Sequence, residues 1–405
     1  MKILLYTDLV LGPRQLFWER DLGLLTQSFR NLGHDAWLVV HPASESTSKI
    51  QNQKSKISND PVIWASPSDV RNPSWWQDHK PDLVILGLWT RPKYDSVRRA
   101  ALSTTPHVIE RADSDGIRTS SCGLRNYTQR RYDYFRDRTY RWPAGVSILA
   151  SALYALASVL ATPWIEARLA KTLRLLPAVA VETPTAAVLW KHLANRLGAD
   201  PSRIHCIPHP IQTNIFHPDA SIRKKKQIIS VGRWESYQKN YPLLVKTLAA
   251  FLEENSSWTA LVVGSGLPPT PPHSRIFFSA PLPPVHLARQ MQESRVFLAS
   301  SRYESFGLAA AEGAACGNHV VMPSHLWAHP ALPAPLNQPV SLVDRLCRAA
   351  HSASLPTPAA SGEALAGPRV AGLFLALMPR LGCQPVVPQS VATAGFVNNS
   401  PARCP

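Results

Sequence analysis

Short apolar runs alternate with longer amphipathic segments through most of the chain. An apolar run at 2–7 is followed by a helix-like stretch at 15–32 and by a second apolar run at 36–40. This strand–helix–strand order favours parallel pairing of the strands. Two more strand candidates, at 82–88 and 107–109, each follow a proline that marks the entry to an extended segment. The first half of the chain is therefore predicted to form a parallel α/β sheet.

The same alternation continues to residue 322, with one interruption. After a strand at 178–181 and a helix at 185–197, the chain becomes extended and rich in proline. A second series of strands follows at 227–231, 259–263, 275–279, 296–299 and 319–322, with helices at 242–254, 285–293 and 308–316 between them. We predict two Rossmann-like domains, 1–204 and 227–322, joined by a linker at 205–226.

Composition limits the kinds of partner. The chain has 405 residues, 45% of them hydrophobic and 17% charged, which is typical of globular domains and not of disordered chains. A net charge of +16 predicts an anionic partner, namely nucleic acid, acidic lipid or a phosphorylated substrate. The six cysteines are scattered, which favours neither a zinc site nor a disulfide framework and fits a reducing cytoplasm.

One region of the first domain departs from the strand–helix alternation. Residues 118–141 hold seven arginines interleaved with aromatic side chains, and residues 143–165 contain no charged residue. The uncharged run is long enough to span a bilayer, but spanning would place the two domains on opposite sides of the membrane. The sequence leaves open two interpretations of 118–165, a segment that associates peripherally with the inner face of an anionic membrane and an ordinary buried helix. Nucleic acid is disfavoured, because no recognisable nucleic-acid module accompanies the arginines.

The segment 301–317 carries the strongest candidate chemistry. Glu304 and Glu312 lie eight positions apart around a predicted helix start, with Gly307 between them. A glycine lets the backbone approach a ligand closely, and the free N–H groups of a helix's first turn suit a phosphate. Carboxylates bind hydroxyl groups, so the segment matches both parts of a nucleotide sugar. Taken alone, two acidic residues on a helix are more often a solvated face.

Two other segments strengthen this interpretation. The linker contains IPHPIQTNIFHP, and the strand that opens the second domain ends in Gly-Arg, followed six residues later by Lys239. In this order the three segments resemble the family-4-type, or group 1, retaining glycosyltransferases of the GT-B fold, most clearly over 178–321. The resemblance implies that Arg233 and Lys239 contact the diphosphate of the donor. Fixed cations there would stabilise a departing nucleoside diphosphate without a metal or other cofactor.

The resemblance also assigns the remaining donor-side residues. It implies that Glu304 contacts hydroxyls of the transferred sugar and that Glu312 binds the donor ribose. The diphosphate would meet the backbone of 305–308, and Gly264 would lie beside the nucleotide. These predicted donor-binding residues of the second domain are Ser305, Phe306, Gly307, Leu308, Glu312 and Gly264.

The chain departs from the family pattern at both ends. The first loop, where the family has a glycine pair, retains only Gly12, and no histidine follows the strand at 106–110. Asp113 and Asp115 are the candidates there for orienting an acceptor hydroxyl. Residues 323–405 contain thirteen prolines and no lysine, with helix candidates only at 341–350 and 370–378. We interpret this Pro/Ala-rich tail as an irregular, disordered or truncated remainder that lacks the family's C-terminal units and its helix back to the first domain.

Together these features predict a two-domain GT-B protein with a cleft between its domains. Its function would be transfer of a sugar from a nucleotide diphosphate sugar to a glycan, lipid or small-molecule acceptor, with retention. The main alternative is a catalytically impaired relative that binds nucleotide or membrane. A glycoside hydrolase would also use two carboxylates, but it accounts for neither Arg233 nor Lys239.

Overall fold

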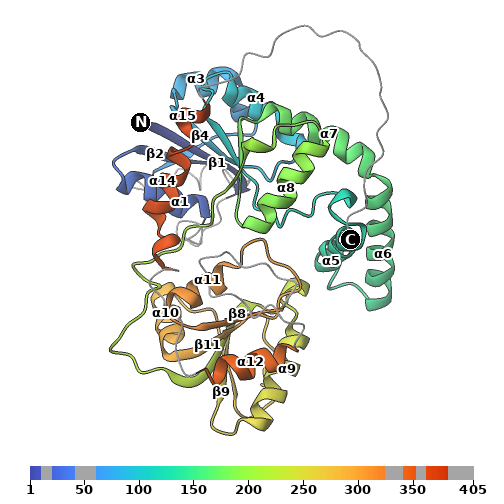
Figure 1. Cartoon of the computed structure of the whole chain (residues 1–405), viewed down its shortest axis with the longest axis vertical. Helices are drawn as coiled ribbons and strands as arrows, with labels where there is room; N and C mark the ends of the chain where they lie inside the picture. The colour runs from blue at the N-terminus through green and yellow to red at the C-terminus, as the bar shows by residue number, and fades with distance from the viewer. Residues whose placement is uncertain (11–20, 42–60, 324–340, 353–361, 382–405) are drawn as a thin grey trace, which may run out of the picture.

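The computed structural model describes residues 1–10, 21–41, 61–323, 341–352 and 362–381, and these residues form two α/β domains (Figure 1). Each domain is built on one sheet whose strands are all parallel. The first sheet has the order β3-β2-β1-β4-β5-β6-β7, and the second has the order β10-β9-β8-β11-β12. In both sheets the order reverses beside the first strand of the domain, which is the position where doubly wound sheets open a crevice for ligands.

The first domain contains the seven strands β1 (Lys2–Val10), β2 (Asp35–His41), β3 (Val62–Trp64), β4 (Leu83–Gly87), β5 (Val108–Arg111), β6 (Ala178–Val181) and β7 (Ile204–Cys206). Its helices are α1 (Asp21–Asn31), α3 (Pro73–His79), α4 (Asp95–Leu102), α5 (Leu124–Arg138), α6 (Ala144–Leu160), α7 (Thr162–Leu175) and α8 (Pro184–Arg196). Strand β4 is apolar along its length, because helices cover both faces of a parallel sheet. The core has two layers, one on each face of the first sheet. In one layer α1 packs against the sheet, and in the other Trp76 of α3 packs against the opposite face.

The second domain contains β8 (Lys225–Arg233), β9 (Thr259–Ser265), β10 (Ile276–Ser279), β11 (Ser294–Leu298) and β12 (His319–Val321). Its helices are α9 (Tyr241–Glu254), α10 (Pro284–Glu293), α11 (Leu308–Ala315) and α12 (Leu342–Ala350). The single turn η6 (Tyr237–Lys239) connects β8 to α9. Helices α10 and α11 pack on one face of this sheet, and α9 and α12 pack on the other.

The C-terminal region contains more structure than its composition predicts. Helix α12 begins with a capping box, in which Ser341 and Asp344 bond each other's backbone N–H groups, and it lies against the second sheet. Helix α14 (Gly367–Leu375) packs instead against α1, where Phe374 is fully buried in the first domain's core (Figure 1). A short helix, α15 (Met378–Leu381), follows. The chain thus has a helix back to the first domain, which corrects the expectation that this helix is lost.

The architecture predicted from the alternation of strands and helices, two Rossmann-like α/β domains, is confirmed. Both helix candidates of the C-terminal region are observed. The exact domain limits stay a prediction, and Gly12 lies outside the described residues. None of the described helices has by itself the length and apolarity to cross a bilayer, whereas the pair α6 and α7, bent by 62°, meets the criterion jointly by length and composition.

Candidate functional site

The carboxyl ends of β8 and β9 form the floor of the candidate site in the second domain. Gly232 pairs with Gly264 across these strands, and a Cβ added to Gly264 would lie 1.8 Å from the Gly232 carbonyl oxygen. Gly264 also has a φ of 144°, so only glycine fits this close crossing of two backbones. Arg233 follows directly at the end of β8, with an exposed side chain that has no hydrogen-bond or ion-pair partner among the described residues. A free guanidinium thus stands at the strand end.

Lys239 and Glu304 meet above this floor. Lys239 Nζ donates to Glu304 Oε1 over 2.5 Å, and the lysine stem lies over Gly232. Glu304 Oε1 also accepts from the Ser301 hydroxyl at 2.7 Å. The backbone N–H of Arg302 donates to the Gln238 carbonyl at 2.8 Å, which joins the loop after β8 to the loop after β11. The two loops therefore hold an ammonium and a carboxylate in fixed positions.

The start of α11 lies beside this pair. Gly307 precedes the helix with φ 87°, and within the described residues no side chain caps the first N–H groups, which leaves donors available at the positive end of the helix dipole. Leu308 is the first helical residue, and Phe306 is buried in the second core. Glu312, one turn further along, is also buried. We call Arg233, Lys239, Glu304 and Gly307 the second-domain wall.

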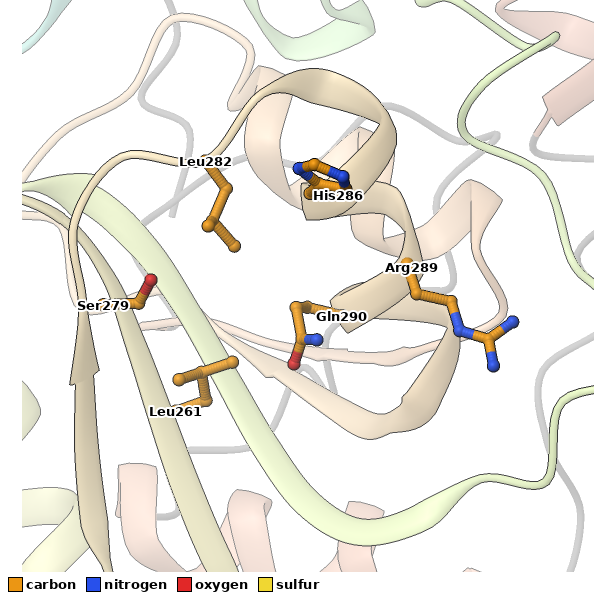
Figure 2. Close-up of a pocket in the computed structure, with 6 residues that line it drawn as sticks. All are labelled: Leu261, Ser279, Leu282, His286, Arg289 and Gln290. Carbon is orange, nitrogen blue, oxygen red and sulfur yellow. The ribbon is translucent and has the colours of Figure 1, made fainter.

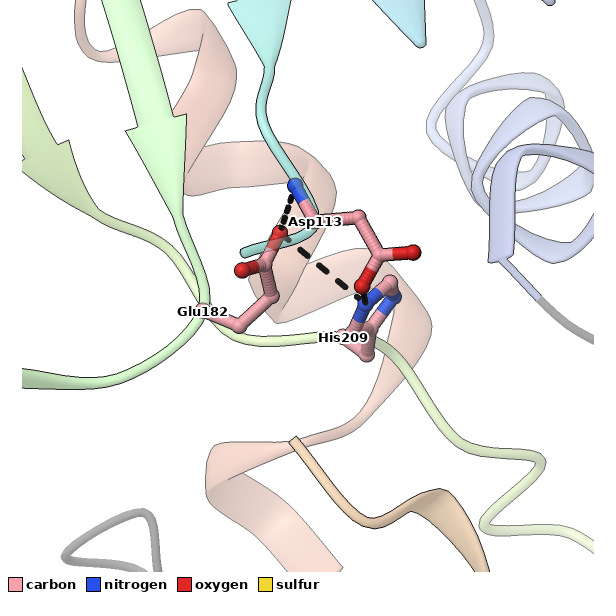
Figure 3. A group of neighbouring side chains, drawn as sticks. All are labelled: Asp113, Glu182 and His209. Carbon is pink, nitrogen blue, oxygen red and sulfur yellow. Dashed lines mark hydrogen bonds and ion pairs between the residues drawn. The ribbon is translucent and has the colours of Figure 1, made fainter. Parts of the chain in front are cut away.

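A cluster of ionisable side chains faces this wall from the first domain. Asp113 and Glu182 follow β5 and β6, which are neighbouring parallel strands, and His209 lies beyond β7 (Figure 3). Glu182 accepts from the backbone N–H groups of Asp113 at 2.7 Å and Ser114 at 3.0 Å. These bonds hold Asp113 in a left-handed conformation with φ 41°. His209 Nε2 is 3.6 Å from Asp113 Oδ1 and 4.0 Å from Glu182 Oε1. We call Asp113, Glu182 and His209 the acid–histidine cluster.

Burial and mutual charge set the protonation of the cluster. Burial and the nearby Asp113 carboxylate raise the pKa of Glu182 to about 7. Burial and Arg111 lower the pKa of His209, but the carboxylates of Asp21 and Asp113 outweigh them and raise it to about 9. Burial also acts to raise the pKa of Asp113, yet His209 and the Ser305 hydroxyl bring it well below its usual value. At neutral pH the cluster therefore pairs an imidazolium with the Asp113 carboxylate.

The acid–histidine cluster also has the composition of a cation site. One ligand atom from each of Asp113, Glu182 and His209 lies within 4.8 Å of the others. Both oxygens of Glu182 already accept backbone N–H bonds, and a histidine must be neutral to ligate a metal. Because the pKa of His209 is raised, its imidazole is protonated at neutral pH. The imidazolium balances the negative charge of the carboxylates, which a bound metal ion would otherwise do. The expectation of no metal stays a prediction.

The two walls contact each other directly. The Ser305 hydroxyl donates to Asp113 Oδ1 at 2.7 Å, and the His209 and Phe306 rings lie 5.5 Å apart. Helix α5 adds further contacts, because Asp137 Oδ1 accepts from the Ser236 hydroxyl at 2.8 Å and from the Gln238 N–H at 3.0 Å. The predicted cleft is thus bounded by both domains and bridged by hydrogen bonds.

A hollow of about 440 Å³ lies between α5 and the second-domain wall. Asp115 lines it and pairs with Arg130 Nε at 2.5 Å, while the Arg130 guanidinium stacks over the Tyr303 ring. The other lining residues are Ile117, Asn126, Gln129, Asp133, Asn240, Arg302 and Glu304. Hydroxyl-binding side chains of both domains therefore surround a space that reaches Glu304.

A second hollow lies in the second domain, between the sheet and α10 (Figure 2). Figure 2 shows Leu261 on β9 and Ser279 at the end of β10 across from His286 and Gln290 of α10, while the Arg289 side chain extends away from them. No residue predicted from the sequence as part of the site lines this hollow.

The structure groups most of the predicted site residues. Arg233, Lys239, Glu304 and 305–308 lie along one wall, with Gly264 in the floor beneath. Asp113 and Asp115 lie on the opposite side, but in different surroundings, because Asp113 belongs to the acid–histidine cluster and Asp115 lines the hollow. Sequence reasoning missed Glu182 and His209. The signal for Glu182 is an acidic residue directly after an apolar strand, a position similar to that of Asp113 two residues after β5.

Comparison with known proteins gives two kinds of similarity. Residues 225–332 match the family model of glycosyl transferases group 1. The D-inositol 3-phosphate glycosyltransferase of Acidothermus cellulolyticus is 30% identical over 158 residues, which cover 32% of this chain and 35% of that protein. The chain thus aligns with about a third of the length of this curated relative.

Solved structures extend the similarity to the whole fold. The pneumococcal O-GlcNAc transferase GtfA, solved in complex with UDP and GlcNAc, gives a TM-score of 0.60 at 12% identity, covering 95% of this chain and 99% of that one. The apo lipopolysaccharide outer core galactosyltransferase WaaB gives a TM-score of 0.57 at 13% identity, covering 95% of this chain and 100% of that one. At such identities the likeness concerns the fold. Residues 225–332 are therefore similar in sequence to group 1 glycosyl transferases, and the described part of the chain has the GT-B fold.

Proposed function

We propose that the protein transfers a glycosyl group from a nucleoside diphosphate sugar to an acceptor hydroxyl. The observation that carries the proposal is the second-domain wall, where Arg233, the Lys239–Glu304 pair and the free N–H groups at the start of α11 converge. A diphosphate seated there would meet an exposed guanidinium and a helix dipole of the right sign. When the diphosphate binds, the Lys239 ammonium would weaken its ion pair with Glu304 and turn toward a phosphate oxygen.

The chemistry follows from where charge develops. As the glycosidic bond of the donor breaks, the electron pair leaves with the diphosphate, and Arg233, Lys239 and the α11 amides stabilise that charge. Glu304, held by Ser301 and Lys239, would bind hydroxyls of the transferred sugar. The buried Glu312 would bind the ribose, as expected from the family resemblance. Because these groups supply the positive field, we expect chelators to leave the reaction rate unchanged.

The acceptor would enter from the side of the first domain. The hollow of about 440 Å³ between α5 and Glu304 offers polar side chains that suit a glycan, a lipid headgroup or a small molecule. Asp113 is poised to orient the attacking hydroxyl, since its low pKa keeps it ionised. Retention of the anomeric configuration is part of the proposal, on the strength of the family resemblance. A cytoplasmic location also stays a prediction, consistent with the four described cysteines being free thiols.

The test is release of nucleoside diphosphate from a panel of UDP-, GDP- and ADP-sugars. We expect release from at least one donor and a strong loss in Glu304→Ala, with Glu363→Ala as the control because Glu363 is an exposed glutamate on the C-terminal segment. Equal release by wild type and Glu304→Ala would contradict the role of Glu304.

A parallel titration of donor binding separates the alternatives. Donor binding that depends on Lys239, with no release over a wide range of acceptors, would favour the catalytically impaired relative. Absence of both binding and release would overturn the proposed function. Analysis of the product anomer by NMR then tests retention.

A further inference from the structure

Helix α6 has its apolar face outside and its polar face inside. Its large apolar side chains recur every three or four residues and form one stripe along the helix. They are strongly exposed, with 63% for Leu149 and 73% for Leu160. The full stripe consists of Val146, Leu149, Leu153, Leu156 and Leu160. A surface helix of a globular domain normally has the opposite arrangement.

The inner face of α6 is made of serines that contact α5. Ser147, Ser151 and Ser158 are buried, and Arg131 Nε of α5 donates to the Ser158 hydroxyl at 3.2 Å. Arg136 of α5 donates to the Ser147 hydroxyl in the same way. Both hydrogen bonds join the serine face of α6 to arginines of α5, so they orient the helix with its serines toward α5. The hydrogen bonds therefore fix the leucine stripe outward.

Aromatic side chains stand at both ends of the stripe. Trp142 and Trp164 are 50% and 62% exposed, and α6 between them is about 25 Å long. Figure 1 shows α6 at the outer edge of the molecule, with α5 between it and the rest. An apolar strip of this length flanked by indole rings is typical of a segment that lies in a membrane interface.

Positive charge adjoins one end of the stripe. The Arg168 guanidinium of α7 stacks on the Trp164 ring, 4.6 Å from its centroid. Arg168 also lines a hollow of about 670 Å³ together with four more cations, Lys93, Arg99, Lys171 and Arg174. Asp95 is the one acid in this lining, and it is already bonded to Arg98 and Thr172. The hollow thus has a large excess of positive charge.

We propose that α6 docks this protein on the surface of an anionic phospholipid bilayer. The leucine stripe would lie at the boundary of the acyl chains, and the cations around Arg168 would bind headgroup phosphates. Only one side of α6 is open to lipid, because α5 covers the other, so the helix lies in the plane of the interface. Charge complementarity selects this occupant over a second copy of the chain, since each copy carries +16.

The test uses the full chain and sedimentation with vesicles of phosphatidylcholine, with and without phosphatidylglycerol. We expect binding that rises with phosphatidylglycerol content and weakens with salt. Replacing Leu149, Leu153 and Leu156 together by serine should reduce binding at least about tenfold. Val188→Ser is the matched control, because Val188 is 65% exposed on α8 of the same domain. Since all these side chains are exposed, circular dichroism and thermal unfolding should stay unchanged.

A second variant separates charge from apolar contact. Arg168→Glu combined with Lys171→Glu should remove the preference for phosphatidylglycerol, whereas Lys246→Glu on α9 of the second domain should not. Unchanged binding by the triple serine variant would overturn the proposal. So would a vesicle-free dimer that the same variant dissociates, because the stripe would then be an interface between two copies. Vesicle binding is measured without a sugar donor, so its failure is distinct from failure of the proposed function.

Discussion

The two walls of the cleft reach their positions by different physical routes. The second-domain wall consists of exposed or half-buried groups from two short segments, 232–239 and 301–308, which meet because β8 and β11 are neighbours in the sheet. In the acid–histidine cluster Glu182 and His209 are buried and Asp113 is half-buried, and the three residues come from segments that are far apart in the chain. The first wall is thus more exposed and comes from two short segments, whereas the second is more buried and comes from three. Mutations should therefore act mainly on function in the first case and on stability and its pH dependence in the second.

Removing the ammonium from the second-domain wall should have the largest effect. Lys239→Ala should lower kcat/KM for donor turnover on the order of 10²–10³-fold, because one fixed charge that stabilises a leaving group has about this value. Thermal unfolding should change little, since Lys239 is partly exposed and Glu304 can be solvated when its partner is lost. Lys246→Ala, on the outer surface of α9, is the control for loss of a lysine. A variant with wild-type turnover would remove the wall from the mechanism.

Gly264, in the floor beneath the second-domain wall, is the position in this part of the site where a substitution should most reduce stability. Gly264→Ala places a Cβ against the Gly232 carbonyl at 1.8 Å, at a φ of 144° that L-residues rarely adopt. We expect a loss of about 2–4 kcal/mol from the free energy of unfolding. The control is Gly372→Ala in α14, where an added Cβ meets nothing within 4 Å. Thermal denaturation that shows equal Tm values for both variants would contradict the close crossing of β8 and β9.

The acid–histidine cluster should reveal itself through pH. The folded pKa of His209 is raised to about 9 from a usual value of about 6.5, so the stabilisation it provides is complete below pH 6.5. This stabilisation is lost as the pH rises through 9. His209→Gln should therefore reduce stability on the order of 2 kcal/mol near pH 6 and progressively less toward pH 9.

Urea unfolding across this pH range measures the difference. The control is His107→Gln, because His107 is a partly exposed histidine that contacts the Asp82 carbonyl. It shows how much the pH dependence of the free energy of unfolding changes when any histidine is replaced. Glu182 affects stability over a lower pH range. Its pKa is raised from 4.5 to about 7, so the free energy of unfolding falls as the pH rises from 4.5 to 7 and Glu182 ionises. Parallel stability curves for wild type and His209→Gln would exclude the ion pairs of His209 with Asp21 and Asp113.

The same contrast explains what could be predicted from the sequence. Arg233 and Lys239 belong to one short motif and Glu304 to another, so the sequence shows their spacing; the structure brings Lys239 and Glu304 together, and their roles stay a prediction. Glu182 belongs to no such motif, and although His209 lies in the linker segment IPHPIQTNIFHP, that segment does not indicate which side chains it meets. Their proximity depends on β5 and β6 being neighbours in the sheet and on the path of the chain after β7, which a single sequence does not specify.

The C-terminal region shows a second limit of sequence reasoning. Thirteen prolines in residues 323–405 suggest a chain without a core. However, α14 needs only a few apolar side chains, because α1 and the first sheet already provide the surface on which Phe374 is buried. Tertiary packing thus decides the structure of a segment whose own composition is a poor guide.

Loss of the Ser305–Asp113 hydrogen bond, which joins the two walls, should have the smallest effect. It tests whether contact between the walls serves catalysis or stability. Ser305→Ala removes the hydroxyl that donates to Asp113 Oδ1 across the cleft. Because Asp113 keeps 36% of its side chain exposed, water can replace the lost donor, and we expect a cost of about 1 kcal/mol. If the bond positions the donor-side helix start against the cluster, this cost should appear as a fivefold change in kcat/KM. If the bond only holds the domains together, Ser305→Ala should lower the Tm and leave turnover unchanged. Measuring both quantities for Ser305→Ala and for Ser236→Ala, whose hydroxyl bridges to Asp137 away from Asp113, separates positioning from fastening.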